Sequence, residues 1–452
     1  MRDLVFVAYL GLFFALGFRR PFLFVLAYVY IDLVSPQRLT YYLLNAVPIS
    51  MIASGLAILG WLAADDKRDL RIAPRQGLLF LLLGYCWYTT LNADFPVEAA
   101  FKWEWVWKSL AFAIFLPLTL RTRLRIEALL LFVVLATASI IIVGGIKTLA
   151  TGGGGYGQLN LMVANNSGLY EGSTISMAAI ALIPVILWLM KHGTVFPPDW
   201  RVRLFGYALL FACLLIPVGT SARTGLLCIA LLFVLLLRDA RRRFLYLGGA
   251  ALLAVIAVPF LPSTFTDRMS TIKTYQADAS ASTRLAVWQW TWDYVKDHPL
   301  GGGFDAYLQN NIRYDKVKVE KGADGQATVA RELEVDKARA YHSAYFEMLG
   351  EQGWPGFLLW LGVHLGGLFR MEVLRRRYRK ADGDQAWIAP LASALQHGHL
   401  IYLLGAAFVG IALNPFIYLI VGAQIGLDTY LAGQRARAGA KPFRAPPRPL
   451  PA

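Results

Sequence analysis

Charged residues are scarce in this sequence: Asp, Glu, Lys and Arg make up 16% of its 452 residues, whereas 57% are hydrophobic. Soluble domains carry about 25% charged residues, so a soluble globular protein is excluded. Apolar runs long enough to span a bilayer recur along the chain instead. The sequence therefore predicts an all-α polytopic membrane protein.

Cysteine is also rare. The three cysteines, Cys86, Cys213 and Cys228, all lie inside apolar runs, where cysteine behaves as a small hydrophobic residue. A disulfide framework, a redox site and a zinc site are therefore not expected. The acidic residues outside the apolar runs show no metal-ligand spacing, so the sequence predicts neither a metal nor a cofactor.

Twelve apolar runs are predicted as membrane spans, with a long polar segment between the ninth and the tenth. The runs cover about residues 4–34, 47–63, 76–91, 106–120, 127–145, 174–190, 203–219, 223–238, 245–260, 355–369, 398–413 and 416–431. The first run is broken at Arg19-Arg20-Pro21, and either one kinked span or a hairpin of two fits it. The last two runs are separated only by Asn414-Pro415, which predicts a tight hairpin.

The positions of the basic residues predict the orientation of the chain. The formal charge of +15 is concentrated in short loops between alternate spans, which argues against nucleic-acid binding and marks those loops as cytoplasmic. Both termini are then cytoplasmic and the long polar segment is external, although a hairpin in the first run would move the N-terminus outside. The membrane lipids are the expected surroundings.

Four regions follow from this pattern. Residues 1–261 form an N-terminal bundle of about nine spans, and residues 262–354 form the external, partly helical segment. Residues 355–432 supply about three more spans. The basic tail over 433–452 has too little apolar surface to fold, so it is predicted to be disordered.

The external segment carries an amphipathic, tryptophan-rich run that begins at Arg284. Leu285, Trp288, Trp292 and Val295 recur at helical spacing on one face. Such a helix suits the headgroup layer of a membrane and places Arg284 at the level of phosphates. An arginine that only anchors the helix to lipid headgroups explains the pattern equally well.

Arg223 stands at the external mouth of the eighth predicted span. Ser221, Thr224 and Gly225 surround it, and hydroxyl groups with a close backbone approach are what an oxyanion requires. The alternative is an arginine that extends to the interface to anchor the span, because an arginine facing lipid costs a few kcal/mol.

His342 is the candidate base of the external segment. Its ordinary pKa lies near neutrality, so it can accept a proton from a hydroxyl group at working pH. Glu347 and Asp305 are candidates to orient its ring, and a purely structural histidine is the alternative. Tyr345 follows on the same predicted helix.

A second external loop combines a glycine run at residues 152–155 with Asn165 and Asn166. Glycine runs can cradle phosphate through backbone N–H groups, but this one lacks the Lys-Ser/Thr ending of a P-loop. A flexible loop with amide donors that contact substrate is the preferred interpretation.

Together, two arginines and a histidine beside a membrane cavity suit glycosyl transfer from a polyprenyl diphosphate. Arginine binds phosphate oxygens with two parallel hydrogen bonds and stays charged. Arg223 and Arg284 can therefore neutralise the diphosphate leaving group without a metal, while His342 removes the proton of the acceptor hydroxyl.

The order and spacing of these motifs resemble the O-antigen ligase and polymerase superfamily of bacterial envelopes. The motifs are Ser-Ala-Arg-Thr-Gly at 221–225, Arg284 with Trp288, Pro-Leu-Gly-Gly-Gly at 299–303, His-Ser-Ala-Tyr at 342–345 and Gly-Glu-Gln-Gly at 350–353. The stretch over 267–280 and Arg38-Leu39-Thr40 look most similar to the O-glycosylation ligases associated with exosortase systems.

The resemblance implies an inner-membrane glycosyltransferase of GT-C-like fold with a periplasmic active site. It implies an undecaprenyl-diphosphate-linked glycan as donor and lipid A-core, another glycan or a protein as acceptor. Arg223, Arg284 and His342 would be catalytic, Ser221, Thr224, Trp288, Tyr345, Asn165 and Asn166 would contact substrate, and the inverting transfer would need no metal.

Three alternatives stay open. A polymerase of the same superfamily would use a second lipid-linked glycan as acceptor, and a protein O-oligosaccharyltransferase would use a protein. A transporter would carry ionisable residues at mid-span, whereas the predicted spans are nearly free of charge.

Overall fold

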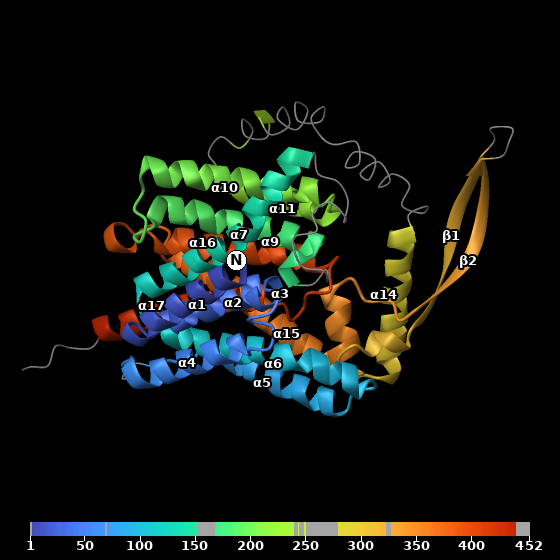
Figure 1. Cartoon of the computed structure of the whole chain (residues 1–452), viewed down its shortest axis with the longest axis horizontal. Helices are drawn as coiled ribbons and strands as arrows, with labels where there is room; N and C mark the ends of the chain where they lie inside the picture. The colour runs from blue at the N-terminus through green and yellow to red at the C-terminus, as the bar shows by residue number, and fades with distance from the viewer. Residues whose placement is uncertain are drawn as a thin grey trace, which may run out of the picture.

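The computed structural model describes residues 2–67, 70–151, 168–238, 243, 248–249, 279–321 and 327–439. Helices that run side by side dominate this part of the chain (Figure 1). The longer ones are α1 (Arg2–Arg19), α2 (Phe22–Val34), α4 (Ile49–Ala64), α5 (Pro74–Leu91), α6 (Pro96–Thr119), α7 (Arg123–Thr151), α9 (Gly172–His192), α10 (Trp200–Gly219), α11 (Arg223–Leu237), α14 (Ala279–Asp297), α15 (Ala344–Arg377), α16 (Ile388–Ala406) and α17 (Pro415–Gly439).

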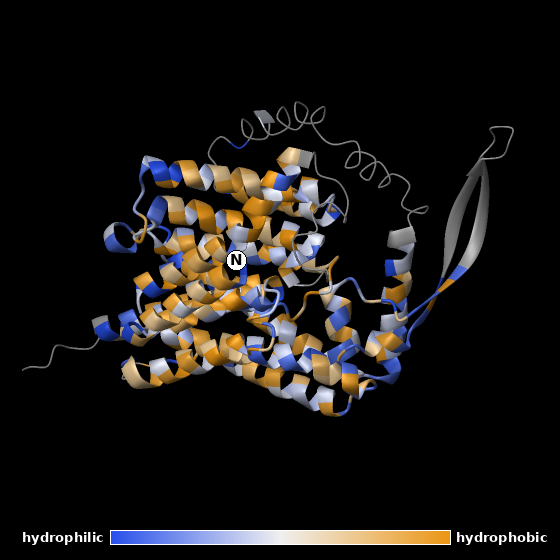
Figure 2. Ribbon diagram, in the orientation of Figure 1, coloured by the Kyte–Doolittle hydropathy of each residue, from blue (hydrophilic) through white to orange (hydrophobic). Residues whose placement is uncertain are grey.

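Five described helices are long and apolar enough to cross a membrane: those that begin at Arg123, Gly172, Trp200, Ala344 and Pro415. Three shorter helices, α2, α4 and α11, are also apolar. Figure 2 shows hydrophobic residues along the middle of the bundle and hydrophilic residues toward its two ends. The prediction of a helical membrane protein is therefore confirmed, while the count of twelve spans stays a prediction. The predicted span over 245–260 lies almost wholly outside the described residues.

The first apolar run forms a hairpin of two helices. Tyr9 of α1 contacts Tyr30 of α2 at a ring separation of 5.0 Å, and Phe14 lies 6.2 Å from Phe24, so the two helices are antiparallel. The Asp3 carboxylate accepts hydrogen bonds from backbone N–H groups that follow the short α3 (Pro36–Leu39), among them that of Tyr41 at 3.0 Å. Of the two alternatives for residues 4–34, the structure adopts the hairpin.

The basic loops share one end of the bundle. Arg125 binds Asp65 at 2.5 Å, Arg123 donates to the backbone carbonyl of His192 at 2.8 Å, and Arg238 binds Glu372 at 2.9 Å. Arg125 also lies over the ring of Phe22, which places the turn between α1 and α2 at this end. The N-terminus lies at the other end of α1 from this turn, and the side of the membrane on which each terminus lies stays a prediction.

The last two predicted spans are shifted relative to the observed helices. Helix α16 ends at Ala406, not at residue 413, because residues 407–414 form an irregular connection. Its backbone carbonyls accept side-chain hydrogen bonds: Tyr402 donates to Ile411, and Trp360 and Tyr418 donate to Ala412. The predicted tight hairpin at Asn414-Pro415 is therefore wrong. Helix α17 continues to Gly439, so the predicted disorder from residue 433 is wrong as far as that residue.

At the other end of the bundle, α14 stands across the helix ends and a β-hairpin projects beyond it (Figure 1). Strands β1 (Asn311–Lys321) and β2 (Ala327–Lys337) pair antiparallel, with Asn311 opposite Lys337. This two-stranded sheet departs from the all-helical prediction. The base of the hairpin is fixed by Asn310, whose amide bonds the backbone N–H and carbonyl of Arg339.

Candidate functional site

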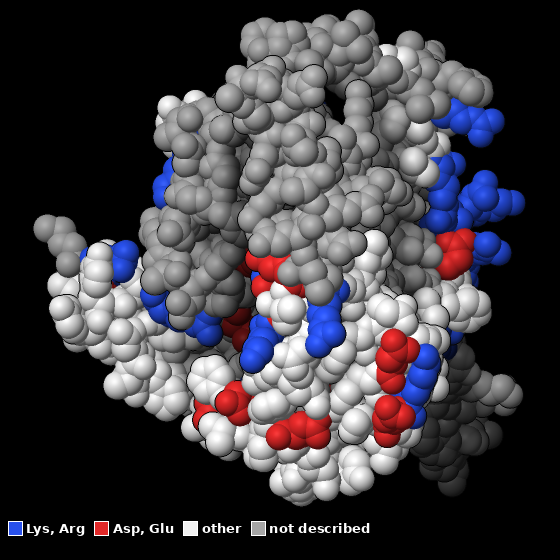
Figure 3. Space-filling view, turned by 90° about the vertical axis from the view of Figure 1, so that its right-hand side faces the viewer, with Lys and Arg blue, Asp and Glu red and all other residues white. Residues whose placement is uncertain are grey.

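A polar cavity of about 470 Å³ lies at the end of the bundle that carries α14. Arg284 of α14 and His342, which precedes α15, both line it. Glu171 and Ser173 from the start of α9 and residues 408–410 from the α16–α17 connection contribute further wall. Figure 3 looks onto this end and shows basic and acidic side chains gathered next to one another on the described surface. The structure thus brings two of the three predicted catalytic residues into one cavity.

Helix α14 is held against the segment that carries His342. The Trp288 indole N–H donates to the Tyr341 carbonyl at 2.9 Å, and its ring stacks on Phe346 at 5.0 Å. Arg284 lies one turn before Trp288 on the same face of the helix, and it lines the same cavity as His342. Trp288 therefore positions the site, in addition to the substrate contact predicted for it.

His342 has an unusual backbone conformation, with φ at +50°. A non-glycine residue in this region is held there by its surroundings, and such residues cluster at functional sites. Loss of hydration in the cavity, then the charges of Arg284 and Arg339, lower the pKa of His342, while Glu171 opposes them. The imidazole therefore stays neutral, and able to accept a proton, at a lower pH than an ordinary histidine.

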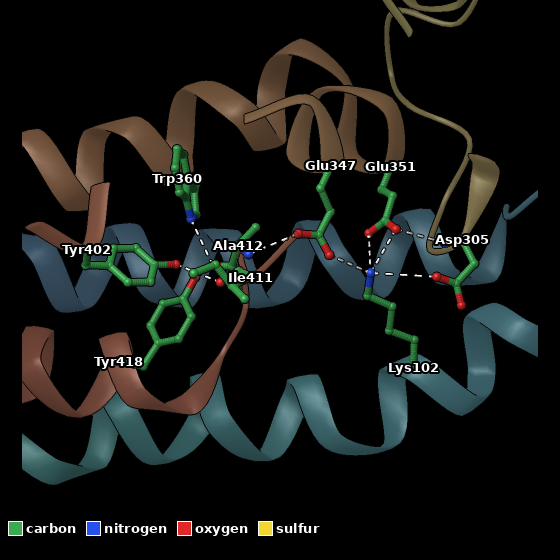
Figure 4. Close-up of polar contacts among 9 residues, drawn as sticks. All are labelled: Lys102, Asp305, Glu347, Glu351, Trp360, Tyr402, Ile411, Ala412 and Tyr418. Atoms are coloured by element: carbon green, nitrogen blue, oxygen red, sulfur yellow. Dashed lines mark hydrogen bonds and ion pairs between the residues drawn. The ribbon is translucent and has the colours of Figure 1, made fainter. Parts of the chain in front are cut away.

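The floor of the cavity is an ionic cluster around Lys102 of α6 (Figure 4). The Lys102 ammonium lies 2.8 Å from both Glu347 and Glu351 and 3.7 Å from Asp305. The other oxygen of Glu347 accepts the N–H of Ala412 at 3.0 Å. Burial raises the pKa of Asp305, and the charge of Lys102 opposes that rise. The expectation that Glu347 and Asp305 orient His342 is wrong, because both carboxylates bind Lys102 and Glu347 also accepts the backbone N–H of Ala412.

The glycine turn at residues 299–303 fixes this cluster. Gly302 and Gly303 donate to the carbonyls of Gly350 and Glu351, and Trp354 donates to that of Pro299. Gly353 breaks α15 with φ at +59°, and a Cβ there would collide with the Pro299 carbonyl. Two backbones approach this closely only with glycine at the contact, which explains why both motifs are glycine-rich.

Arg223 does not line the cavity with Arg284 and His342. It begins α11, behind a sharp turn in which Ser221 has φ at +51°. The neighbouring Thr220 bonds Ser176 of α9 at 2.7 Å, and a Cβ added at Gly172 would lie 3.3 Å from the Thr220 side chain. Arg223 therefore lies near the α9 end that lines the cavity. Thr224 and Ser221 are buried, and the Ser221 hydroxyl has no hydrogen-bond partner among the described residues.

The remaining predicted contacts divide into two groups. Tyr345 donates to the Leu403 carbonyl at 3.0 Å and packs on Trp360, so its described contacts join α15 to α16. Asn165 and Asn166 lie outside the described residues. The face predicted on α14 is exposed at Leu285 and Trp292 but buried at Val295, and Val287 and Thr291 outside that face are buried as well. Its role at the membrane surface stays a prediction.

The sequence interpretation missed Lys102 and Glu351. Lys102 precedes the predicted span over 106–120. Its acidic partners are distant in the sequence: Glu347 is 245 positions away and Glu351 is 249 positions away. The local signal that could have revealed it is a lysine among the aromatic residues of a helix that begins earlier, at Pro96.

The spans, predicted to be nearly free of charge, contain a buried chain of polar side chains. Within the bundle, His364 bonds His399 at 2.7 Å, His399 bonds Gln424 at 3.1 Å, and Gln424 bonds Arg75 at 3.1 Å. These four side chains connect α5, α15, α16 and α17. None of them lines the cavity of Arg284 and His342. Within the described ranges, no group of three or more His, Cys, Asp or Glu is arranged to hold a metal ion.

These features define a helical membrane protein with a polar cavity at one end of its bundle. Residues 207–361 match a family model described as O-antigen ligase, and residues 1–194 match a family of unknown function. No curated protein matches the chain. The match over 207–361 contains Arg223, Arg284 and His342, and it supports a place in the O-antigen ligase superfamily and a glycosyltransferase of ligase or polymerase type.

Proposed function

We propose that this protein is an O-antigen ligase-type glycosyltransferase of the bacterial inner membrane. It takes a glycan from undecaprenyl diphosphate and joins it to a periplasm-facing acceptor, lipid A-core of lipopolysaccharide. The observation that carries the proposal is the meeting of Arg284 and His342 in one polar cavity. Both residues fall in the region that matches the O-antigen ligase family.

The chemistry assigns one role to each residue. His342 takes the proton from the acceptor hydroxyl as that oxygen forms a bond to the anomeric carbon. The bond between this carbon and the diphosphate oxygen breaks, and its electron pair leaves with undecaprenyl diphosphate, so the configuration inverts. Arg284 neutralises the leaving group, which is the larger electrostatic contribution, while general base catalysis contributes about 100-fold to 10,000-fold.

Arg223 is proposed as the second diphosphate contact. Its support is its position, because Thr220 in the same turn bonds Ser176 of α9, whose first residues include the cavity residue Ser173. A guanidinium at this helix start and Arg284 would approach the diphosphate from different helices. Since two parallel hydrogen bonds are lost with a point charge, Arg223→Lys is expected to retain little activity.

The alternative function within the superfamily differs only in the acceptor. A polymerase would add the glycan to a second lipid-linked glycan, and a protein O-oligosaccharyltransferase would add it to a protein. The buried chain from Arg75 to His364 is the feature that a transporter would share. Its separation from the cavity favours the glycosyltransferase.

The test is transfer by the purified full-length protein in liposomes, with a synthetic undecaprenyl-diphosphate glycan, lipid A-core and EDTA. We expect product in the wild type, and a loss of at least about 100-fold in His342→Ala and Arg284→Ala. His298→Ala is the matched histidine control, because His298 stacks on Tyr294 at 4.2 Å, lies 3.2 Å from the Tyr294 carbonyl and does not line the cavity. The exposed Arg313 on β1 provides the arginine control, Arg313→Ala.

Each outcome has a distinct meaning. Elongation of the donor without transfer to lipid A-core would identify a polymerase. Loss of product in EDTA would contradict the metal-free mechanism. Near-normal turnover in His342→Ala and Arg284→Ala, with both proteins folded, would overturn the proposed site.

A further inference from the structure

A second cavity of about 700 Å³ adjoins the cavity of Arg284 and His342. The two share part of their walls: Lys102, Glu171, Asp305, Glu347, Val409 and Gly410. Its volume lies within the range of about 300–1,000 Å³ that is usual for ligand sites. A ligand in this cavity would therefore reach the ionic cluster that also forms the floor beside His342.

The walls that belong only to the second cavity come largely from the N-terminal region. Asp32 and Glu104 face it together with Arg38 and Lys108, and Trp105 adds an exposed ring. All five lie in the part of the chain that matches a family of unknown function. Carboxylates, cationic side chains and an aromatic face together suit the hydroxyl groups and C–H faces of a sugar.

The Tyr28 hydroxyl gives a second, independent indication of a ligand. Tyr28 lines this cavity and is 1% exposed, and its hydroxyl has no hydrogen-bond partner among the described residues. Its ring is fixed by stacking on Phe112 at 3.8 Å. A buried hydroxyl without a partner is unfavourable, and a hydroxyl of a bound glycan would supply the missing bond.

We propose that the second cavity binds the glycan of the acceptor, and that the N-terminal region thereby sets acceptor specificity. This inference rests on the proposed function. The shared wall lets an acceptor in the second cavity extend its hydroxyl past Lys102 to His342, while Arg284 holds the diphosphate of the donor in the first cavity. Donor and acceptor are then bound by different regions of the chain.

The kinetic test varies the two substrates separately in the full-length protein. Trp105→Ala is expected to raise the KM for lipid A-core about tenfold or more, with the KM for the undecaprenyl-diphosphate glycan unchanged. Trp107→Ala is the matched control, because Trp107 lies on the same helix, is also exposed and does not line the cavity. Tyr28→Phe keeps the stacked ring and removes only the hydroxyl, so it should raise the acceptor KM without lowering the melting temperature.

A rise in donor KM with an unchanged acceptor KM would overturn the proposal, as would equal effects of Trp105→Ala and Trp107→Ala. Binding separates this proposal from the proposed function. In the His342→Ala background, calorimetry with the lipid A-core oligosaccharide alone should show binding that Trp105→Ala abolishes and Arg284→Ala preserves. Absence of oligosaccharide binding would overturn the acceptor subsite. Binding without any wild-type transfer would instead contradict the catalytic proposal.

Discussion

His342 is surrounded by groups that set the pH at which it can accept a proton. Loss of hydration and the charges of Arg284 and Arg339 lower its pKa. The neutral, proton-accepting form is favoured above that pKa, so the transfer rate should rise with pH and then level off. Because the pKa is lowered, the rise should be complete at a lower pH than for an ordinary histidine, whose pKa is about 6.5.

Arg339 allows this electrostatic effect to be tested without touching the cavity. Its guanidinium lies 3.6 Å from Asp336 and is not among the cavity residues. Arg339→Gln removes a positive charge near His342, so the pKa should rise and the acid limb of log(kcat/KM) should move to higher pH. The exposed Arg313 provides the control Arg313→Gln, which should leave the limb in place. A shift to lower pH in Arg339→Gln would contradict the assignment of His342 as the titrating base.

Single residues were predictable where their chemistry was unusual for their place. Arg284 and His342 stood out because each is a rare polar group beside apolar or aromatic residues, and the structure places both in one cavity. Lys102 could not be found in this way. Its importance lies in its contacts with Glu347 and Glu351. These partners are 245 and 249 positions away, and no local sequence pattern predicts contacts at that separation.

Among the elements, α6 and α15 are joined by the ionic cluster that floors the site. Lys102 supplies the cation for three carboxylates, and Glu351 is fully buried. Removing one partner of a buried ion pair leaves uncompensated charge and costs about 3–5 kcal/mol. Lys102→Met, which keeps most of the apolar volume, should therefore lower the free energy of unfolding by about that amount.

The measurement is thermal unfolding of the purified protein in detergent. Lys296→Met is the matched control, since Lys296 makes an exposed ion pair with Asp293 at 2.6 Å and such pairs contribute about 0–1 kcal/mol. Adding Glu351→Gln to Lys102→Met should recover part of the loss, because one fewer carboxyl group can carry an unpaired charge. Equal melting temperatures for Lys102→Met and Lys296→Met would show that the cluster does not stabilise α6 against α15.

Over the whole molecule, hydrophobic periodicity and length predicted most helices, because each must satisfy its backbone within the membrane. Hydrophobic periodicity and length could not decide whether residues 4–34 form one kinked helix or a hairpin of two. The break at Arg19-Arg20-Pro21 permits either a kink or a turn, and the choice depends on long-range contacts such as that of Asp3 with Tyr41. The β-hairpin was missed although residues 316–320 and 332–336 alternate between charged and aliphatic side chains, a pattern that is typical of strands.

The hairpin of α1 and α2 changes the predicted topology of the N-terminus. The distribution of basic residues predicted a cytoplasmic N-terminus for a single first span, whereas a hairpin places it outside. The α2 end, the α14 cavity and the β-hairpin share one end of the bundle, since Arg38, Asp305 and Glu347 line one cavity. The basic loops lie at the other end. If the charged end is cytoplasmic, the N-terminus is periplasmic and only the C-terminus is cytoplasmic.

Cysteine labelling can test this arrangement, because Cys86, Cys213 and Cys228 are all buried and should give little background. In spheroplasts, a membrane-impermeant maleimide should label Tyr42→Cys, Arg313→Cys and a cysteine added before Met1. Arg379→Cys, at the basic end, should react only after the membrane is opened. Labelling of Tyr42→Cys and Arg313→Cys from opposite sides would contradict the shared end. If the N-terminal cysteine, like Arg379→Cys, reacts only after the membrane is opened, residues 4–34 form a single span. The hairpin would then be absent, and Asp32 and Arg38 would not form a wall of the second cavity.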